Sequence, residues 1–72
     1  MRIIKDVLEV VICVDKKLVI IVYTPDMNKI ADRDYALWVL YKKYDVVKIM
    51  VPDDNPDLLE DKIKEIIKRY CG

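Results

Sequence analysis

Two copies of a short acidic phrase are the residues of this chain best suited to chemistry. Proline, aspartate, a variable residue and asparagine occur at residues 25–28 and again at residues 52–55, each time between an apolar run and a segment with helical periodicity. Carboxylate and amide oxygens are the ligands that Mg²⁺ takes in proteins. If both loops lie at the carboxyl edge of one sheet, Asp26, Asp53 and Asp54 converge there. We expect no cofactor, with Mg²⁺ at these aspartates as the alternative.

Helix capping explains most of the same phrase. Asp and Asn side chains cap helix N-termini, and Pro presets the turn that leads from a strand into a helix. Asp53 and Asp54 are the residues that capping leaves unexplained. The preferred interpretation of the phrase is therefore two strand-to-helix turns. The second interpretation is that their shared acidic edge binds a cation or a basic partner.

A second acidic stretch resembles a catalytic signature. The apolar residues from Val11 onward run into Asp15-Lys16-Lys17, which resembles the acid-x-Lys pattern of restriction-endonuclease-like nucleases, with Asp6 or Glu9 as the upstream acid. The resemblance implies that the carboxylates bind Mg²⁺ and that the lysine stabilises the attacking species. A hairpin turn is the competing interpretation of these polar residues.

The two cysteines suit a structural role better than a catalytic one. The chain has no His or Ser, so neither a zinc site nor an activated thiol is indicated. The topology expected below brings Cys13 and Cys71 to the same edge of the sheet, where a disulfide would stabilise the fold by about 4 kcal/mol. The alternative is a buried Cys13 and a reduced Cys71.

The elements that position these residues follow from the apolar pattern. Residues 10–14 and 18–23 form an antiparallel hairpin, a helix begins near Asp26 or Asn28 and ends near Tyr44, and residues 46–51 form a strand parallel to the second one. Asn55 is expected to cap a last helix in which Pro56 is the first residue. The buried stripe of that helix is predicted to contain Leu59, Ile63, Ile66, Ile67 and Tyr70.

The first residues of the chain fit two structures. Residues 2–9 match either a helix or a long strand, and we favour a strand that continues to residue 14. Such a strand outruns its hairpin partner and leaves an apolar edge that pairs readily with a second copy. Ile4 and Leu8 are the interface residues predicted on this edge.

The first helix has more apolar surface than one sheet contact requires. Residues 35–41 are almost wholly apolar, and the predicted sheet-facing stripe of this helix contains Ile30, Leu37, Tyr41 and Tyr44. Tyr35 and Trp38 then point elsewhere and are predicted as interface anchors, with core packing as the alternative.

These elements predict one α/β domain over residues 1–72, on the border with α+β. We expect a two-layer ββαβα sandwich, with a mixed three-stranded sheet that contains one antiparallel hairpin and one parallel βαβ unit. Both helices are placed on one face, so the open apolar face would be buried by homodimerisation.

The composition of the chain disfavours nucleic acid and membranes as partners. Thirteen basic and thirteen acidic side chains cancel, so no net field attracts nucleic acid or an anionic membrane, and no apolar run approaches membrane-spanning length. We expect a soluble cytoplasmic protein with the many charges and few amides of hyperthermophile proteins. The leading hypothesis is a non-enzymatic, homodimeric protein-interaction or regulatory module. The alternative is a small divalent-metal-dependent hydrolase or nuclease that uses the acidic loops.

Overall fold

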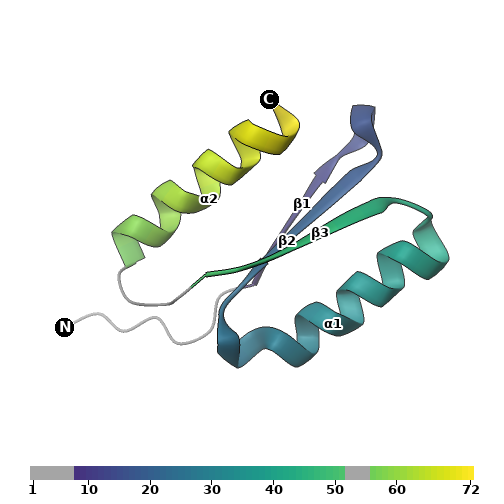
Figure 1. Ribbon diagram of the computed structural model, residues 1–72, viewed down its shortest axis with the longest axis horizontal. Helices are drawn as coiled ribbons and strands as arrows, with labels where there is room; N and C mark the ends of the chain where they lie inside the picture. The colour runs from purple at the N-terminus through teal and green to yellow at the C-terminus, as the bar shows by residue number, and fades with distance from the viewer. Residues whose placement is uncertain (1–7, 52–55) are drawn as a thin grey trace.

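The computed structural model describes residues 8–51 and 56–72. Within these residues the chain forms an α/β fold with a mixed three-stranded sheet and two long helices (Figure 1). In chain order the elements are β1 (Leu8–Cys13), a 3₁₀ turn (Val14–Lys16), β2 (Leu18–Tyr23), a 3₁₀ turn (Pro25–Met27), α1 (Asn28–Leu37), a π-helical turn (Trp38–Lys42), β3 (Asp45–Met50) and α2 (Pro56–Cys71).

The sheet has the predicted topology. β2 lies in the middle, antiparallel to β1 with Leu8 opposite Tyr23, and parallel to β3 with Leu18 opposite Asp45. The hairpin, the parallel βαβ unit and the mixed character of the sheet are therefore confirmed. The expected strand over residues 2–9 lies outside the described residues, apart from Leu8 and Glu9 at the start of β1.

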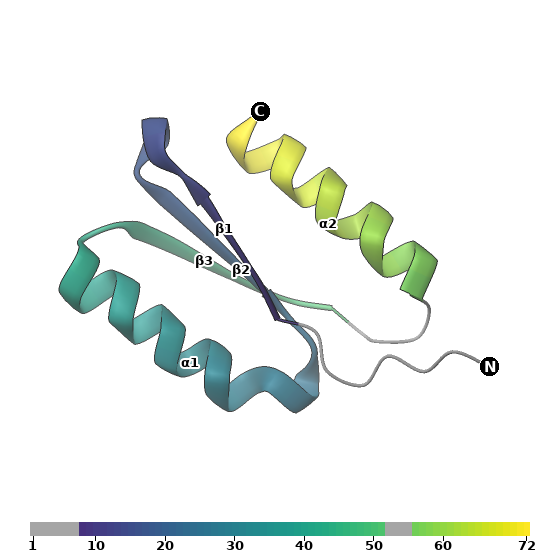
Figure 2. The same cartoon turned by 180° about the vertical axis from the view of Figure 1, so that it is seen from behind.

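The two helices cover opposite faces of the sheet, so the two-layer arrangement was wrong. One buried cluster joins Ile20 and Val22 of β2 to α2, and a second joins Val19 and Ile21 to α1. Figure 1 and Figure 2 show the sheet nearly edge-on between the helices. The apolar sheet face that was expected to be open is covered by α2.

The composition of β2 explains this third layer. All six of its residues are apolar and five of them are buried, so both faces of the strand need cover. The right-handed crossover rule governs only α1, because α1 alone connects two parallel strands. The last helix enters no further strand and is free to cover the second face.

The hairpin turn has left-handed backbone at a lysine. Lys17 follows the 3₁₀ turn with φ of 50°, a conformation that a non-glycine residue adopts at a cost. Its carbonyl oxygen accepts a hydrogen bond of 3.0 Å from the backbone N–H of Asp45. This bond ties the hairpin turn to the start of β3.

The N-terminus of α1 differs from the prediction. Met27 occupies the N-cap position and makes no side-chain cap, while Asn28 is the first helical residue. The expected capping by Asp26 or Asn28 was therefore wrong. A 3₁₀ turn over Pro25–Met27 leads directly into α1.

The sheet-facing side of α1 also differs. Ala31 is fully buried and Trp38 packs against the same cluster, whereas Leu37 and Tyr41 are exposed. A small residue allows the helix backbone to approach the sheet, and Trp38 lies two turns further on the same side. The prediction that Leu37 and Tyr41 face the sheet was wrong.

Candidate interaction surface on strand β1

The outer edge of β1 is unpaired within residues 8–51 and 56–72. No strand in the described part of the chain pairs with this edge, and Glu9 is the only charged residue from Leu8 to Cys13. Edge strands of soluble monomers usually carry lysine, proline or a bulge that prevents pairing with another chain. β1 has none of these features, so its free backbone groups are available to a partner strand.

One side of β1 is also poorly covered. Leu8, Val10 and Ile12 point to the face that α1 covers, but α1 packs over β2 and β3. Val10 is 36% exposed and Ile12 44% exposed, and Val14 in the following turn is 69% exposed. The edge strand therefore presents a row of apolar side chains to solvent.

The near flank of α1 extends this apolar surface. Tyr35 lies on the flank above β3, because its ring is 5.9 Å from the Nζ atom of Lys48 in that strand. Leu37 is about 200° further around the helix, so it lies on the opposite flank, toward β1. Leu37 is 42% exposed. We refer to Val10, Ile12, Val14 and Leu37 as the β1 patch.

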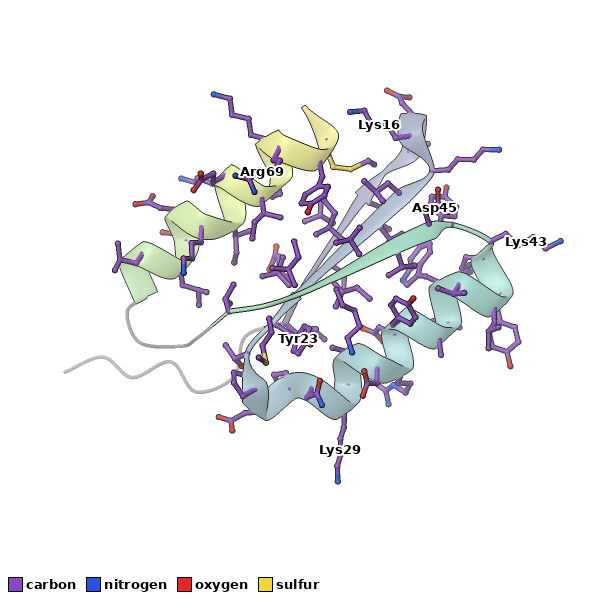
Figure 3. The ribbon with its side chains drawn as sticks, in the orientation of Figure 1. Lys16, Tyr23, Lys29, Lys43, Asp45 and Arg69 are labelled. Atoms are coloured by element: carbon purple, nitrogen blue, oxygen red, sulfur yellow. A yellow bond between two sulfur atoms is a disulfide. The ribbon has the colours of Figure 1, made fainter. Side chains whose placement is uncertain are left out.

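The α2 side of β1 carries an open groove of about 390 Å³. It lies between β1, the hairpin turn and the end of α2, and Val11, Ile67 and Lys16 are among its lining residues. Lys16 extends toward α2 (Figure 3), where its Nζ atom donates a hydrogen bond of 3.3 Å to the backbone oxygen of Tyr70. The groove therefore combines apolar lining residues with Asp15 and Lys16 at its turn end.

A disulfide closes the same end of the molecule. Cys13, the last residue of β1, is bonded to Cys71, the last residue of α2, with the two Cα atoms 5.7 Å apart (Figure 3). This Cα separation lies within the usual range for disulfides. The predicted pairing of the cysteines is confirmed, and the bond holds α2 against the edge strand.

The opposite edge strand has a charged residue at its centre, whereas the charged residue of β1 lies near one end. Lys48 lies in the middle of β3, forms an ion pair with Asp32 of α1, and has its Nζ atom 5.0 Å from the ring centroid of Tyr23. The hydrogen bond to Asp32 raises the pKa of Lys48, against partial burial that lowers it. An inward-pointing charge of this kind discourages a partner strand. Both outer edges are unpaired in the described residues, and Lys48 disfavours pairing at the edge of β3.

The predicted acidic site is only partly visible. Asp26 is exposed in the 3₁₀ turn before α1, while Asp53 and Asp54 lie outside the described residues. Across residues 8–51 and 56–72, no group of three or more acidic, cysteine or histidine side chains could hold a metal ion. Asp15 and Lys17 lie in the hairpin turn and not on a strand, so the geometry of the nuclease-like signature is not formed there.

The predicted interface residues have different environments. Tyr35 is 39% exposed and Leu8 is half-buried beside the β1 patch, while Ile4 lies outside the described residues. Trp38 packs into the core, edge-to-face with Tyr44 at 5.3 Å between ring centroids. Sequence reasoning missed the members of the β1 patch, although the alternation of Val10 and Ile12 in an edge strand was a usable signal.

Comparison with known proteins does not identify a family for this chain. No family model, curated protein or solved structure matches the chain. Neither helix of the described segments combines the length and the apolar character that crossing a bilayer requires. The function must be inferred from the surface itself.

Proposed function

We propose that this chain is a non-enzymatic protein-interaction module that works as a homodimer, in which the β1 strands of two copies pair edge to edge. The observation that carries the proposal is the difference between the two sheet edges. β3 has Lys48 at its centre, whereas the charge on β1 is limited to Glu9 near one end. Pairing through β1 satisfies its free backbone groups and continues the sheet across the two copies.

The β1 patch supports the same assignment. Its four side chains are exposed and apolar, and Val10 and Ile12 belong to the strand whose outer edge is unpaired in the described residues. Burial of apolar surface stabilises association by roughly 25 cal/mol per Å² of area removed from water. Backbone pairing and side-chain burial therefore occur in one interface.

Substitution of Ile12 by lysine tests the proposal. Sedimentation velocity from micromolar to millimolar concentration should show a dimer for the unmodified chain. Ile12→Lys places a charge in the pairing edge, and we expect its dimer dissociation constant to rise at least about tenfold. Met50→Lys is the matched control, because Met50 is exposed on the opposite edge strand and should leave the dimer intact.

Two outcomes would contradict the proposal. A monomer at every concentration removes the homodimer, and equal weakening by Ile12→Lys and Met50→Lys removes the assignment to β1. Circular dichroism of each variant establishes that the monomer fold is retained. Both positions are exposed, so neither substitution introduces a charge into the core.

A further inference from the structure

The dimer proposed above can form in several symmetric registers. A two-fold axis perpendicular to the sheet makes the strands antiparallel and keeps side chains of one face together. An axis through any residue of β1 satisfies this condition, because the residues that oppose each other then belong to the same face. The registers centred on Val10 and on Val11 pair the most residues between Leu8 and Cys13.

We infer that the partner of β1 is a second copy of this chain in the register centred on Val11. This inference rests on the proposed homodimer and adds to it the identity of each contact. In this register Val11 meets Val11 of the second copy, Val10 meets Ile12, and Glu9 lies opposite Cys13. The register centred on Val10 would instead place Glu9 opposite Val11.

Charge complementarity favours the Val11 register. Glu9 is exposed and shares the α2 face of β1 with Val11 and Cys13. Lys16 reaches over that same face, since its Nζ atom contacts the backbone oxygen of Tyr70 at the end of α2. A glutamate placed opposite Cys13 therefore enters the groove that Lys16 lines.

The balance of charge in the hairpin turn is consistent with this contact. Asp15 lines the same groove, but Lys16 and Lys17 outnumber it, so the turn has a net positive charge. The two-fold axis produces the Glu9 to Lys16 contact twice. No ion pair in the described residues of a single copy involves either side chain.

A charge exchange tests the contact between copies. We expect Glu9→Lys and Lys16→Glu each to raise the dimer dissociation constant about tenfold at low ionic strength, because two attractions become repulsions. The double variant Glu9→Lys with Lys16→Glu should return the constant to within about threefold of the original value. Asp61→Lys and Lys64→Glu are matched controls on the exposed side of α2 and should change it little.

The register itself is measured on the unmodified chain. A dimer mixed from ¹³C-labelled and unlabelled copies should give isotope-filtered NOEs between Val11 and Val11, and between Val10 and Ile12. NOEs between the two Val10 residues, or a double variant weaker than either single one, would overturn the inference and leave the homodimer standing. A monomer at millimolar concentration would overturn both.

Discussion

Lys48 shows how one charged side chain is held at the edge of an apolar sheet. Its side chain is 21% exposed, and its ammonium group lies between the carboxylate of Asp32 and the rings of Tyr23 and Tyr35. The ion pair links β3 to α1, and the aromatic contacts are cation–π interactions. The residue therefore stabilises the α1 layer as well as blocking the β3 edge.

The pH dependence of stability should reflect this environment. The pKa of Lys48 is raised above its ordinary value of 10.5, chiefly by the hydrogen bond to Asp32. A group whose pKa is higher in the folded state contributes its stability below the unfolded value and loses it as the pH rises through the folded value. The contribution of Lys48 is therefore fully present at neutral pH and is lost above pH 10.5.

Thermal unfolding of the Lys48→Gln variant measures this contribution. We expect its Tm to lie below that of the unmodified chain by a constant amount at neutral and mildly alkaline pH, and the difference to close above pH 10.5. Lys29→Gln controls for the loss of one positive charge. A Tm difference that widens with rising pH would show that the ammonium group is not what stabilises the contact.

Side-chain environments were the least predictable feature from sequence. The apolar run over residues 35–41 correctly indicated a helix with excess apolar surface, but it did not show which residues face the sheet. Ala31 packs closely against the sheet, and the helix is oriented so that Trp38 faces the core and Leu37 faces solvent. The orientation of the helix about its axis depends on packing against residues distant in the sequence, so helical spacing alone could not determine which residues face the sheet.

Among the elements, α1 has an unusual end. Its last turn is π-helical from Trp38 to Lys42, and Lys43 ends it with φ of 59°. The backbone N–H of Tyr44 donates to the oxygen of Trp38 over 3.2 Å, while the two rings pack edge-to-face. After this widened turn the chain reverses, and the side chain of Tyr44 packs against the core beside Trp38.

Glycine at position 43 should stabilise this helix end. A left-handed residue after a helix is most favourable as glycine, so we expect Lys43→Gly to raise the free energy of unfolding by up to about 1 kcal/mol. Lys29→Gly removes the same side chain in the first turn of α1 and should lower it by up to about 1 kcal/mol. Urea unfolding of both variants is the measurement, and a loss of stability at both positions would contradict the role assigned to Lys43.

Element boundaries could be predicted well wherever a local signal was strong. Pro56 begins α2 as expected, and the two hairpin strands lie within two residues of their predicted ends. The π-helical turn and the left-handed Lys17 had no sequence signal, because lysine at both left-handed positions is not the glycine that such turns favour. Hydrogen bonds accompany both features, from the N–H of Lys17 to the oxygen of Val14 and from the N–H of Tyr44 to the oxygen of Trp38.

For the whole molecule, the layer order is the feature that sequence reasoning missed. The rule for right-handed crossovers placed α1 but gave no information about α2. The uninterrupted apolar sequence of β2 was the available signal, since a strand with six apolar residues requires cover on both faces. With both faces covered, the sheet edges become the sites available for association.

The disulfide should supply much of the stability of so small a fold. It joins residues separated by 58 positions, and restriction of the unfolded chain by such a loop is worth about 4 kcal/mol. We expect reduction to lower the free energy of unfolding by about this amount in urea titrations. Intact mass after alkylation establishes the redox state of each sample.

A double variant provides the control for reduction. Cys13→Ser with Cys71→Ser should match the reduced chain within about 1 kcal/mol, and reductant should not change it further. An unmodified chain whose stability does not respond to confirmed reduction would show that the bond contributes little. Because Cys13 is buried, part of the loss in the serine variant reflects the hydroxyl group introduced there.

The bond between Cys13 and Cys71 also determines how the molecule carries mechanical load. Residues 13–71 form a covalent ring, and a force applied to the two ends of the chain passes through the sulfur atoms. β2, β3 and both helices lie inside this ring and are shielded from tension. β1 lies almost wholly in the loaded segment. The strand to which we assign the interface is thus the element that tension would peel away first, while the rest of the fold stays closed.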